Sequence, residues 1–113
     1  MNIQSVTVAF SVSDLEKAIL WYKRAFGIRK AVRPVQGIAE MQLGPVWLQL
    51  FEREKIPSDA ALRLGVPDVE KERRRLVKMG HQVEEITDVP GVLRYFDFQD
   101  PDGNGLTLYT LYE

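Results

Sequence analysis

The sequence VTVAFSVSDLEK at Val6–Lys17 has a second, related copy in the same chain, AALRLGVPDVEK at Ala60–Lys71. At this shift of 54 residues the identical pairs include Val12 with Val66, Asp14 with Asp68, Glu16 with Glu70 and Lys17 with Lys71. Two copies are too few to build a solenoid. The sequence therefore predicts one domain, residues 1–113, made from two similar modules at residues 1–52 and 59–113.

Each copy begins with a predicted strand, because apolar residues alternate with polar or small ones. The apolar positions are Val6, Val8, Phe10 and Val12 in the first copy and Leu62, Leu64 and Val66 in the second. A period of two residues is typical of a strand with one buried face. Further strands are predicted at residues 29–35, 38–43 and 46–51 in the first module and 83–89, 92–99 and 106–111 in the second. The charged stretch Glu52–Asp59 is the predicted hinge.

A helix is predicted after the first strand of each module. The first helix begins in the capping-box pattern Ser13-Asp14-Leu15-Glu16 and ends at Gly27. Its apolar stripe is Leu15, Ala18, Ile19, Tyr22 and Phe26. The second helix covers about Asp68 to Met79, and its thinner stripe is Val69, Leu76 and Val77. One helix can cover only one face of a four-stranded sheet.

Composition and charge exclude several classes of protein. Lys and Arg total 15 against 16 Asp and Glu, so there is no basic surplus that would favour nucleic acid or an anionic membrane. The run Arg73-Arg74-Arg75 lies just after Glu70 and Glu72, and we expect these side chains to pair along the helix surface. There is no Cys, and therefore no disulfide or thiolate chemistry. Without a membrane-length apolar run or a signal-peptide pattern, a cytoplasmic protein is expected.

The strand alternation predicts which side chains line the uncovered sheet faces. We expect an α+β fold in which the two modules form a curved mixed sheet with a concave cup. Leu48, Leu50, Phe96 and Phe98 are assigned to the helix side, although Arg94 shares the parity of the two phenylalanines. The side chains predicted to face the cup are Thr7, Ala9, Trp47, Gln49, Phe51, Ala61, Arg63, Tyr95, Asp97, Thr107, Tyr109 and Leu111.

Three segments carry a resemblance to a known family. They are VSDLEKA at Val12–Ala18, WYKRAFG at Trp21–Gly27 and, above all, FQDPDGN at Phe98–Asn104. With the paired β-α-β-β-β modules, they resemble the vicinal oxygen chelate superfamily, which includes glyoxalase I, extradiol dioxygenases and bleomycin-resistance proteins. The Asp-Pro-Asp-Gly-Asn turn needs no catalytic role, since Asp and Asn cap it and Gly supplies a positive φ.

The resemblance also implies where a metal would be held. Members that use a metal typically place His or Glu, sometimes Gln, at positions matching Thr7, Gln49, Ala61 and Thr107. Zinc, iron and manganese prefer imidazole and carboxylate donors, and of these four residues only Gln49 keeps any ligand capacity. The one histidine, His81, follows the second helix and lies outside the predicted cup. We therefore expect a metal-ligand-deficient branch, with no metal and no cofactor.

Three function hypotheses remain open. The first is a metal-free binding protein, like the bleomycin-resistance branch, that binds or sequesters an aromatic or planar small molecule. Its predicted ligand-binding residues are Thr7, Trp47, Gln49, Phe51, Arg63, Tyr95, Asp97, Thr107 and Tyr109. The second is a glyoxalase- or dioxygenase-type enzyme with shifted ligands such as Glu40, Gln49 and Asp97. The third is a metal-free acid-base enzyme that uses Asp97 beside Arg63. The resemblance also implies a homodimer.

Overall fold

Two compact units make up the chain, residues 1–58 and 59–113, in a computed structural model that describes residues 2–54 and 61–113. The first unit, module 1, contains β1 (Val6–Val12), α1 (Leu15–Phe26), β2 (Val32–Val35), β3 (Ile38–Leu43) and β4 (Val46–Glu52). The second, module 2, contains β5 (Ala61–Gly65), α2 (Val69–Lys78), β6 (Thr87–Val89), β7 (Leu93–Gln99) and β8 (Gly105–Leu111). The two β-α-β-β-β modules predicted from the repeat are confirmed.

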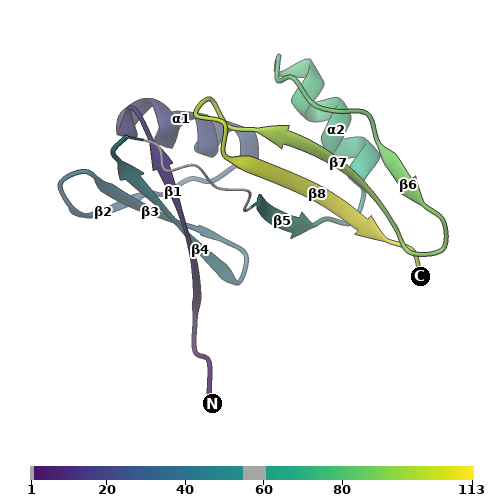
Figure 1. Ribbon diagram of the computed structural model, residues 1–113, viewed down its shortest axis with the longest axis horizontal. Helices are drawn as coiled ribbons and strands as arrows, with labels where there is room; N and C mark the ends of the chain where they lie inside the picture. Colours follow the sequence, from purple (N-terminus) through teal and green to yellow (C-terminus); the bar gives the residue numbers. More distant parts are fainter. Residues whose placement is uncertain (1, 55–60) are drawn as a thin grey trace. The chain divides into compact units, whose positions relative to one another are not determined.

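Each module is a four-stranded mixed sheet with one helix (Figure 1). The strand order is β1-β4-β3-β2 in module 1 and β5-β8-β7-β6 in module 2. In both, the first strand lies parallel to the last strand, which is the result of the helical crossover, and the remaining pairs are antiparallel. This is the α+β class that the sequence predicts.

The repeated Asp14 and Asp68 are the N-caps of the two helices. The Asp14 side chain accepts a hydrogen bond from the Lys17 amide at 3.1 Å, and Asp68 accepts one from the Lys71 amide at the same distance. Both caps have extended backbone angles, as an N-cap requires. The repeat found in the sequence is therefore a repeat of cap geometry as well as of composition.

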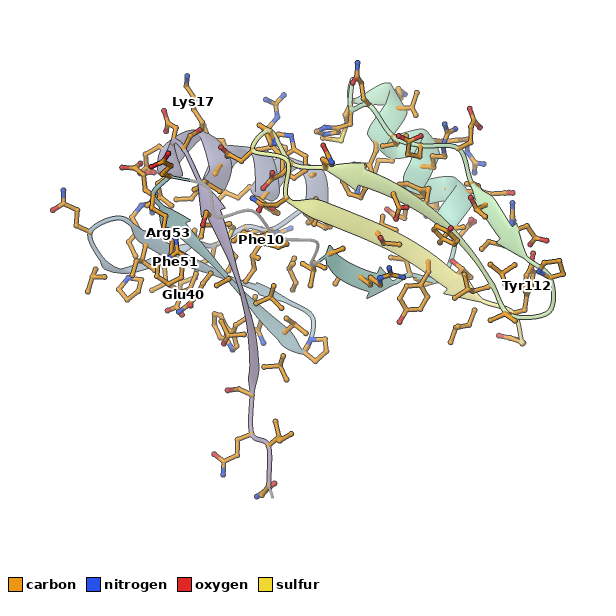
Figure 2. All side chains as sticks on the ribbon, viewed as in Figure 1. Phe10, Lys17, Glu40, Phe51, Arg53 and Tyr112 are labelled. Atoms are coloured by element: carbon orange, nitrogen blue, oxygen red, sulfur yellow. The ribbon has the colours of Figure 1, made fainter. Side chains whose placement is uncertain are left out.

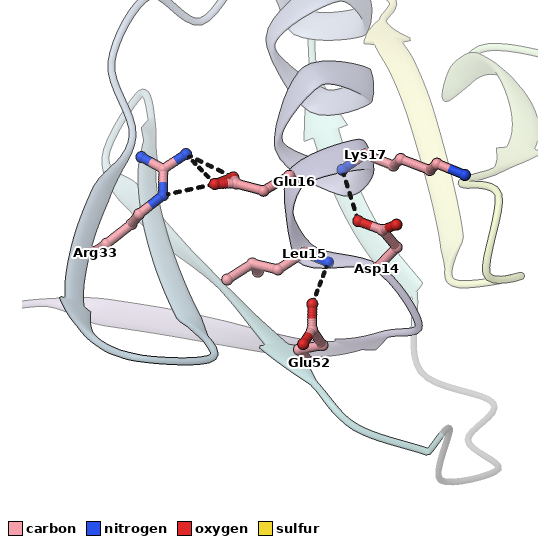
Figure 3. A network of polar contacts seen from close by, with 6 residues as sticks. All are labelled: Asp14, Leu15, Glu16, Lys17, Arg33 and Glu52. Atoms are coloured by element: carbon pink, nitrogen blue, oxygen red, sulfur yellow. Dashed lines mark hydrogen bonds and ion pairs between the residues drawn. The ribbon is translucent and has the colours of Figure 1, made fainter.

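The capping box expected at Ser13–Glu16 is wrong in detail. The helix begins one residue later than that pattern requires, and Glu16 forms an ion pair with Arg33 instead of turning back to the cap (Figure 3). The first amide of α1, at Leu15, donates to Glu52 at the end of β4 at 2.8 Å. A residue 37 positions away thus supplies the second cap, which no local pattern could indicate.

The core of each module lies between its helix and its sheet. Leu48 and Leu50 have no exposed surface, which confirms their assignment to the helix side of β4. Two stripe predictions need correction. Ala25 is buried in α1 while Phe26 is only partly buried, and Val77 of α2 is exposed because the short helix turns it away from the sheet.

Arg94 has a partner that explains an arginine on the helix side of β7. Its guanidinium is hydrogen-bonded to Glu70 on α2, which raises the pKa of Arg94. Phe96 and Phe98 on the same face are buried, as predicted. Glu70 therefore pairs across the module and not along α2, whereas Glu72 does bind Arg75 in the same helix, at 3.1 Å.

Some predicted strands are shorter in the structure. β2 covers only residues 32–35 of the predicted 29–35, and β6 covers only residues 87–89 of the predicted 83–89. Both are edge strands, and Pro34 in β2 has no amide to donate. Most of the predicted hinge lies outside the described residues, and Glu52 belongs to β4. In the described part of the chain no helix is long and apolar enough to cross a membrane, and the cytoplasmic location stays a prediction.

The turn between β7 and β8 is held together by Asp100. Its Oδ1 accepts hydrogen bonds from the amides of Asp102 at 2.9 Å and Asn104 at 2.8 Å, and its Oδ2 accepts one from Asn104 Nδ2 at 2.8 Å. Gly103 supplies a φ of 82°. The Asp-Pro-Asp-Gly-Asn segment therefore acts as a self-capped turn that sets the register between β7 and β8.

Candidate functional site

The helix-free face of each sheet, meaning the face opposite its helix, carries the residues proposed for ligand binding. On module 1, Trp47, Gln49 and Phe51 follow one another along this face of β4, and all three are partly exposed. Thr7 pairs in register with Trp47 and is exposed. The structure therefore places Thr7 beside the three β4 residues on one surface.

The module 2 residues form two rows across the strands. Register pairing joins Arg63 on β5 to Thr107 on β8, and Thr107 to Asp97 on β7. The next row joins Tyr109 to Tyr95. Arg63 and Asp97 thus flank Thr107 on one face, a proximity that the sequence alone could not establish.

At equivalent positions of their sheets, both modules have a neutral side chain that donates a hydrogen bond to a carboxylate on the next strand. In module 1, Gln49 Nε2 on β4 donates to Glu40 Oε2 on β3 at 2.7 Å. In module 2, Thr107 Oγ1 on β8 donates to Asp97 Oδ1 on β7 at 2.5 Å. Gln49 pairs in register with Ala9, and Thr107 pairs with Arg63, which lies 54 residues after Ala9. Each helix-free face therefore presents one carboxylate held by a neutral donor.

Thr107 corrects the prediction that it lines an accessible surface. It lies on the expected face, but only 3% of it is exposed, since flanking side chains cover it and its hydroxyl is bonded to Asp97. Asp97 and Arg63 remain exposed, and the Arg63 side chain has no hydrogen bond or ion pair within the described residues. The exposed charged groups in this row of residues are therefore Arg63 and Asp97.

Tyr109 lies across the backbone of Gly65, its register partner on β5. A Cβ built at Gly65 would stand 3.2 Å from the Tyr109 ring and hydroxyl, closer than ordinary van der Waals contact. Glycine at this position thus lets the ring lie against the strand. The equivalent positions in module 1 are Ser11 and Phe51, which are also register partners.

Arg53 is a residue of this surface that the sequence reasoning missed. Its guanidinium carbon lies 4.9 Å from the centre of the Phe51 ring, and its Nε donates to Ser11 Oγ at 2.9 Å. Figure 2 labels Arg53, Phe51 and Glu40 in module 1. The available signal was strand parity, because residue 53 continues the series 47, 49 and 51 by one more step.

Two open hollows of module 1 lie away from these residues. One, of about 360 Å³, is lined by Leu15, Glu16, Arg33, Val35, Gln36, Gly37 and Glu52. The other, of about 400 Å³, is lined by Phe26, Gly27, Ile28, Arg29, Lys30, Gln42, Leu43 and Gly44. Neither hollow includes a predicted ligand-binding residue. In the first, the ion pair with Arg33 lowers the pKa of Glu16.

The four positions that match family metal ligands do not suit a transition metal. The Ala61 side chain has no donor atom, Thr7 and Thr107 offer only neutral hydroxyls, and Gln49 offers one amide oxygen. The shifted set divides between modules, with Glu40 and Gln49 in module 1 and Asp97 in module 2. Within residues 2–54 and 61–113, no group of three or more His, Cys, Asp or Glu side chains is arranged to hold a metal ion. His81 lies after α2, outside both sheets.

Comparison with known proteins settles the family. The sequence profile of the Glyoxalase/Bleomycin resistance protein/Dioxygenase superfamily matches residues 4–108, nearly the whole chain. The chain belongs to this superfamily. The paired modules, the two helix caps and the Asp100 turn are thus features of a superfamily member, as the resemblance of the three sequence segments predicts.

Relatives within the superfamily include both an enzyme and a binding protein. Metallothiol transferase FosB of Lysinibacillus sphaericus (strain C3-41) is 29% identical, over 97% of this chain and 84% of that protein. The structure of TnmS3, an antibiotic-binding protein from Streptomyces sp. CB03234, has a TM-score of 0.83 at 26% identity and covers 99% of both chains. Lactoylglutathione lyase from Agrobacterium tumefaciens has the same fold, with a TM-score of 0.79 at 20% identity over 95% and 92% of the chains.

Proposed function

We propose that this superfamily member is a metal-free small-molecule-binding protein whose ligand is aromatic or planar and contacts a helix-free sheet face. The observation that carries the proposal is the surface left uncovered by α1 on module 1, where Trp47 and Phe51 are partly exposed on either side of Gln49. Aromatic side chains offer large apolar contact and stacking, while an amide fixes orientation. The antibiotic-binding neighbour supports this class of function.

The helix-free face of module 2 carries charged side chains of its own. Arg63 is exposed on the helix-free face, and a guanidinium can form two parallel hydrogen bonds to a carboxylate. Asp97 and the partly exposed Tyr95 and Tyr109 lie on the same face. We therefore propose that a ligand on this face of module 2 carries an anionic or carbonyl group, which Arg63 would bind, next to a planar part that contacts the tyrosines.

The experiment is a ligand screen followed by tryptophan fluorescence. Trp21 lies on α1 and Trp47 on β4, so quenching that disappears in Trp47→Phe and persists in Trp21→Phe reports the helix-free face. We expect Arg63→Ala to weaken the best anionic ligand by about 1.5–3 kcal/mol. Arg74→Ala, which removes an exposed arginine of α2, is the matched control. If Trp47→Phe and Arg63→Ala both bind as tightly as the parent protein, the site assignment is wrong.

An enzyme is the second candidate, favoured by the metallothiol transferase among the relatives. A metal-dependent version needs donors beyond the four family positions. A metal-free version would use Asp97 as a base, with Arg63 in the same row across Thr107. Chelator should inhibit the metal-dependent enzyme and leave the metal-free enzyme active. Asp97→Asn distinguishes the metal-free enzyme from a binding protein, because this substitution would abolish turnover of a substrate that still binds.

A further inference from the structure

Arg53 follows β4 and is held in place by two contacts from β1 and one from Phe51 of β4. Its backbone amide donates to the Val12 carbonyl at 3.1 Å, and its Nε donates to Ser11 Oγ at 2.9 Å. The guanidinium carbon also lies 4.9 Å from the Phe51 ring centre. Stacking on an aromatic ring and one hydrogen bond along the plane restrict the rotation of a guanidinium.

The remaining edge of this guanidinium is available. Arg53 is exposed, and its Nη1 and Nη2 have no hydrogen bond or ion pair within the described residues. Arg33, Arg73, Arg75 and Arg94, by contrast, are each paired with a glutamate. A pre-positioned edge with two N–H groups matches two oxygens of a carboxylate, phosphate or phosphonate.

The second module lacks the equivalent group. Where module 1 has Ser11 beside Phe51, module 2 has Gly65 beside Tyr109, and the tyrosine ring lies against the glycine. The position two residues after Tyr109 is Leu111, an exposed apolar residue. The two modules therefore differ at this position. Within the described residues, only module 1 has a guanidinium that lies against the aromatic ring.

We propose that Arg53, fixed by Phe51 and Ser11, binds the oxyanion group of a ligand on the helix-free face of module 1. This inference rests on the proposed binding function. It adds that the ligand group bound by module 1 is negatively charged. Phe51 then has two roles, since one side of its ring supports the guanidinium while the face as a whole offers apolar contact to the ligand.

The first test uses inorganic phosphate, which needs no aromatic contact. In a ¹H–¹⁵N spectrum of arginine Nε–H groups, phosphate should shift the Arg53 signal in a saturable way and leave the Arg33 signal in place. Arg53→Lys keeps the charge and loses the planar edge, so we expect the phosphate affinity to fall about tenfold. An Arg53 signal that does not respond to phosphate, or responds no more than that of exposed Arg24, overturns the proposal.

The second test compares benzoate with benzamide, which have the same ring and differ in charge. The parent protein should prefer benzoate by about tenfold, and Arg53→Ala should reduce this preference while Arg24→Ala keeps it. Equal binding of the two probes by the parent, or an unchanged preference in Arg53→Ala, overturns the Arg53 site and leaves the proposed aromatic binding intact. A phosphate response without any Trp47 response to aromatic probes would instead overturn the proposed function and leave Arg53 as an oxyanion site.

Discussion

Thr107 Oγ1 donates to Asp97 Oδ1 across β8 and β7, and it does so from a nearly buried position while the acceptor is exposed. The hydroxyl is therefore satisfied inside the module and is not held ready for a metal or ligand. The equivalent amide in module 1, that of Gln49, is used in the same way by Glu40. In these two pairs, a side chain on a central strand supports a carboxylate on the next strand, and Asp97 is exposed while Glu40 is partly exposed.

Thr107→Val should therefore cost little stability. It removes one hydrogen bond, and the Asp97 oxygen left behind can bind water, so we expect a loss of about 0.5–1.5 kcal/mol in urea unfolding. Thr110→Val is the matched control, because the Thr110 hydroxyl accepts from the first amide of α2 at 3.0 Å and donates to the Val66 carbonyl at 2.8 Å. The control should cost more, about 1–3 kcal/mol. A larger loss for Thr107→Val would contradict the role assigned to its hydroxyl.

The purified protein should carry no stoichiometric divalent transition metal. The family ligand positions hold an alanine, two threonines and a glutamine whose amide is engaged with Glu40. Chelator should leave the melting temperature unchanged, because only a metal that binds the folded state stabilises it. Elemental analysis gives the direct measurement, and one retained equivalent of zinc, nickel, iron or manganese would contradict the metal-free proposal and favour the enzyme alternative.

A homodimer is expected in solution. The helix-free faces leave side chains such as Trp47 partly exposed, and soluble oligomers most often close as symmetric dimers. Light scattering at micromolar concentration should give about 26 kDa, twice the chain mass of 13.0 kDa. A mass of one chain that does not change with concentration would argue against this assembly.

The ion pair between Glu16 and Arg33 should make part of the stability depend on pH (Figure 3). The hydrogen bond from Arg33 lowers the pKa of Glu16 below the ordinary value of a glutamate side chain. A lowered folded-state pKa stabilises the protein above the unfolded-state pKa and loses this effect as pH falls through the folded-state value. Urea unfolding should therefore show Glu16→Gln less stable than the parent at pH 7, with a difference that shrinks as the pH is lowered.

Arg33→Gln and the double variant complete a cycle for the same pair. Both groups are exposed, so the coupling should be small and should shrink as salt is added. If the difference between Glu16→Gln and the parent stays constant from pH 7 to pH 3, the carboxylate contributes through packing and not through its charge.

The local sequence determined the start of the first helix to within one residue, the strand faces and the family. Asp14 and Asp68 act within three residues of themselves, and the alternation around Leu48 and Leu50 needs only a period of two, so neighbouring residues suffice to predict both. The Asp100 turn is closed by bonds that span at most four residues. These features follow from local backbone geometry.

Only the tertiary structure decided which side chains are already engaged in hydrogen bonds, ion pairs or packing within a module. Glu52 caps α1 from 37 residues away, and Arg94 binds Glu70, which lies 24 residues before it. The sequence alone cannot select these partners, because each charged residue has several possible partners of opposite charge. The burial of Thr107, the ring of Tyr109 against Gly65 and the stacking of Arg53 on Phe51 all depend on strand register. Register is set by packing of the whole sheet, and it separates the residues available to a ligand from those already bonded within the module.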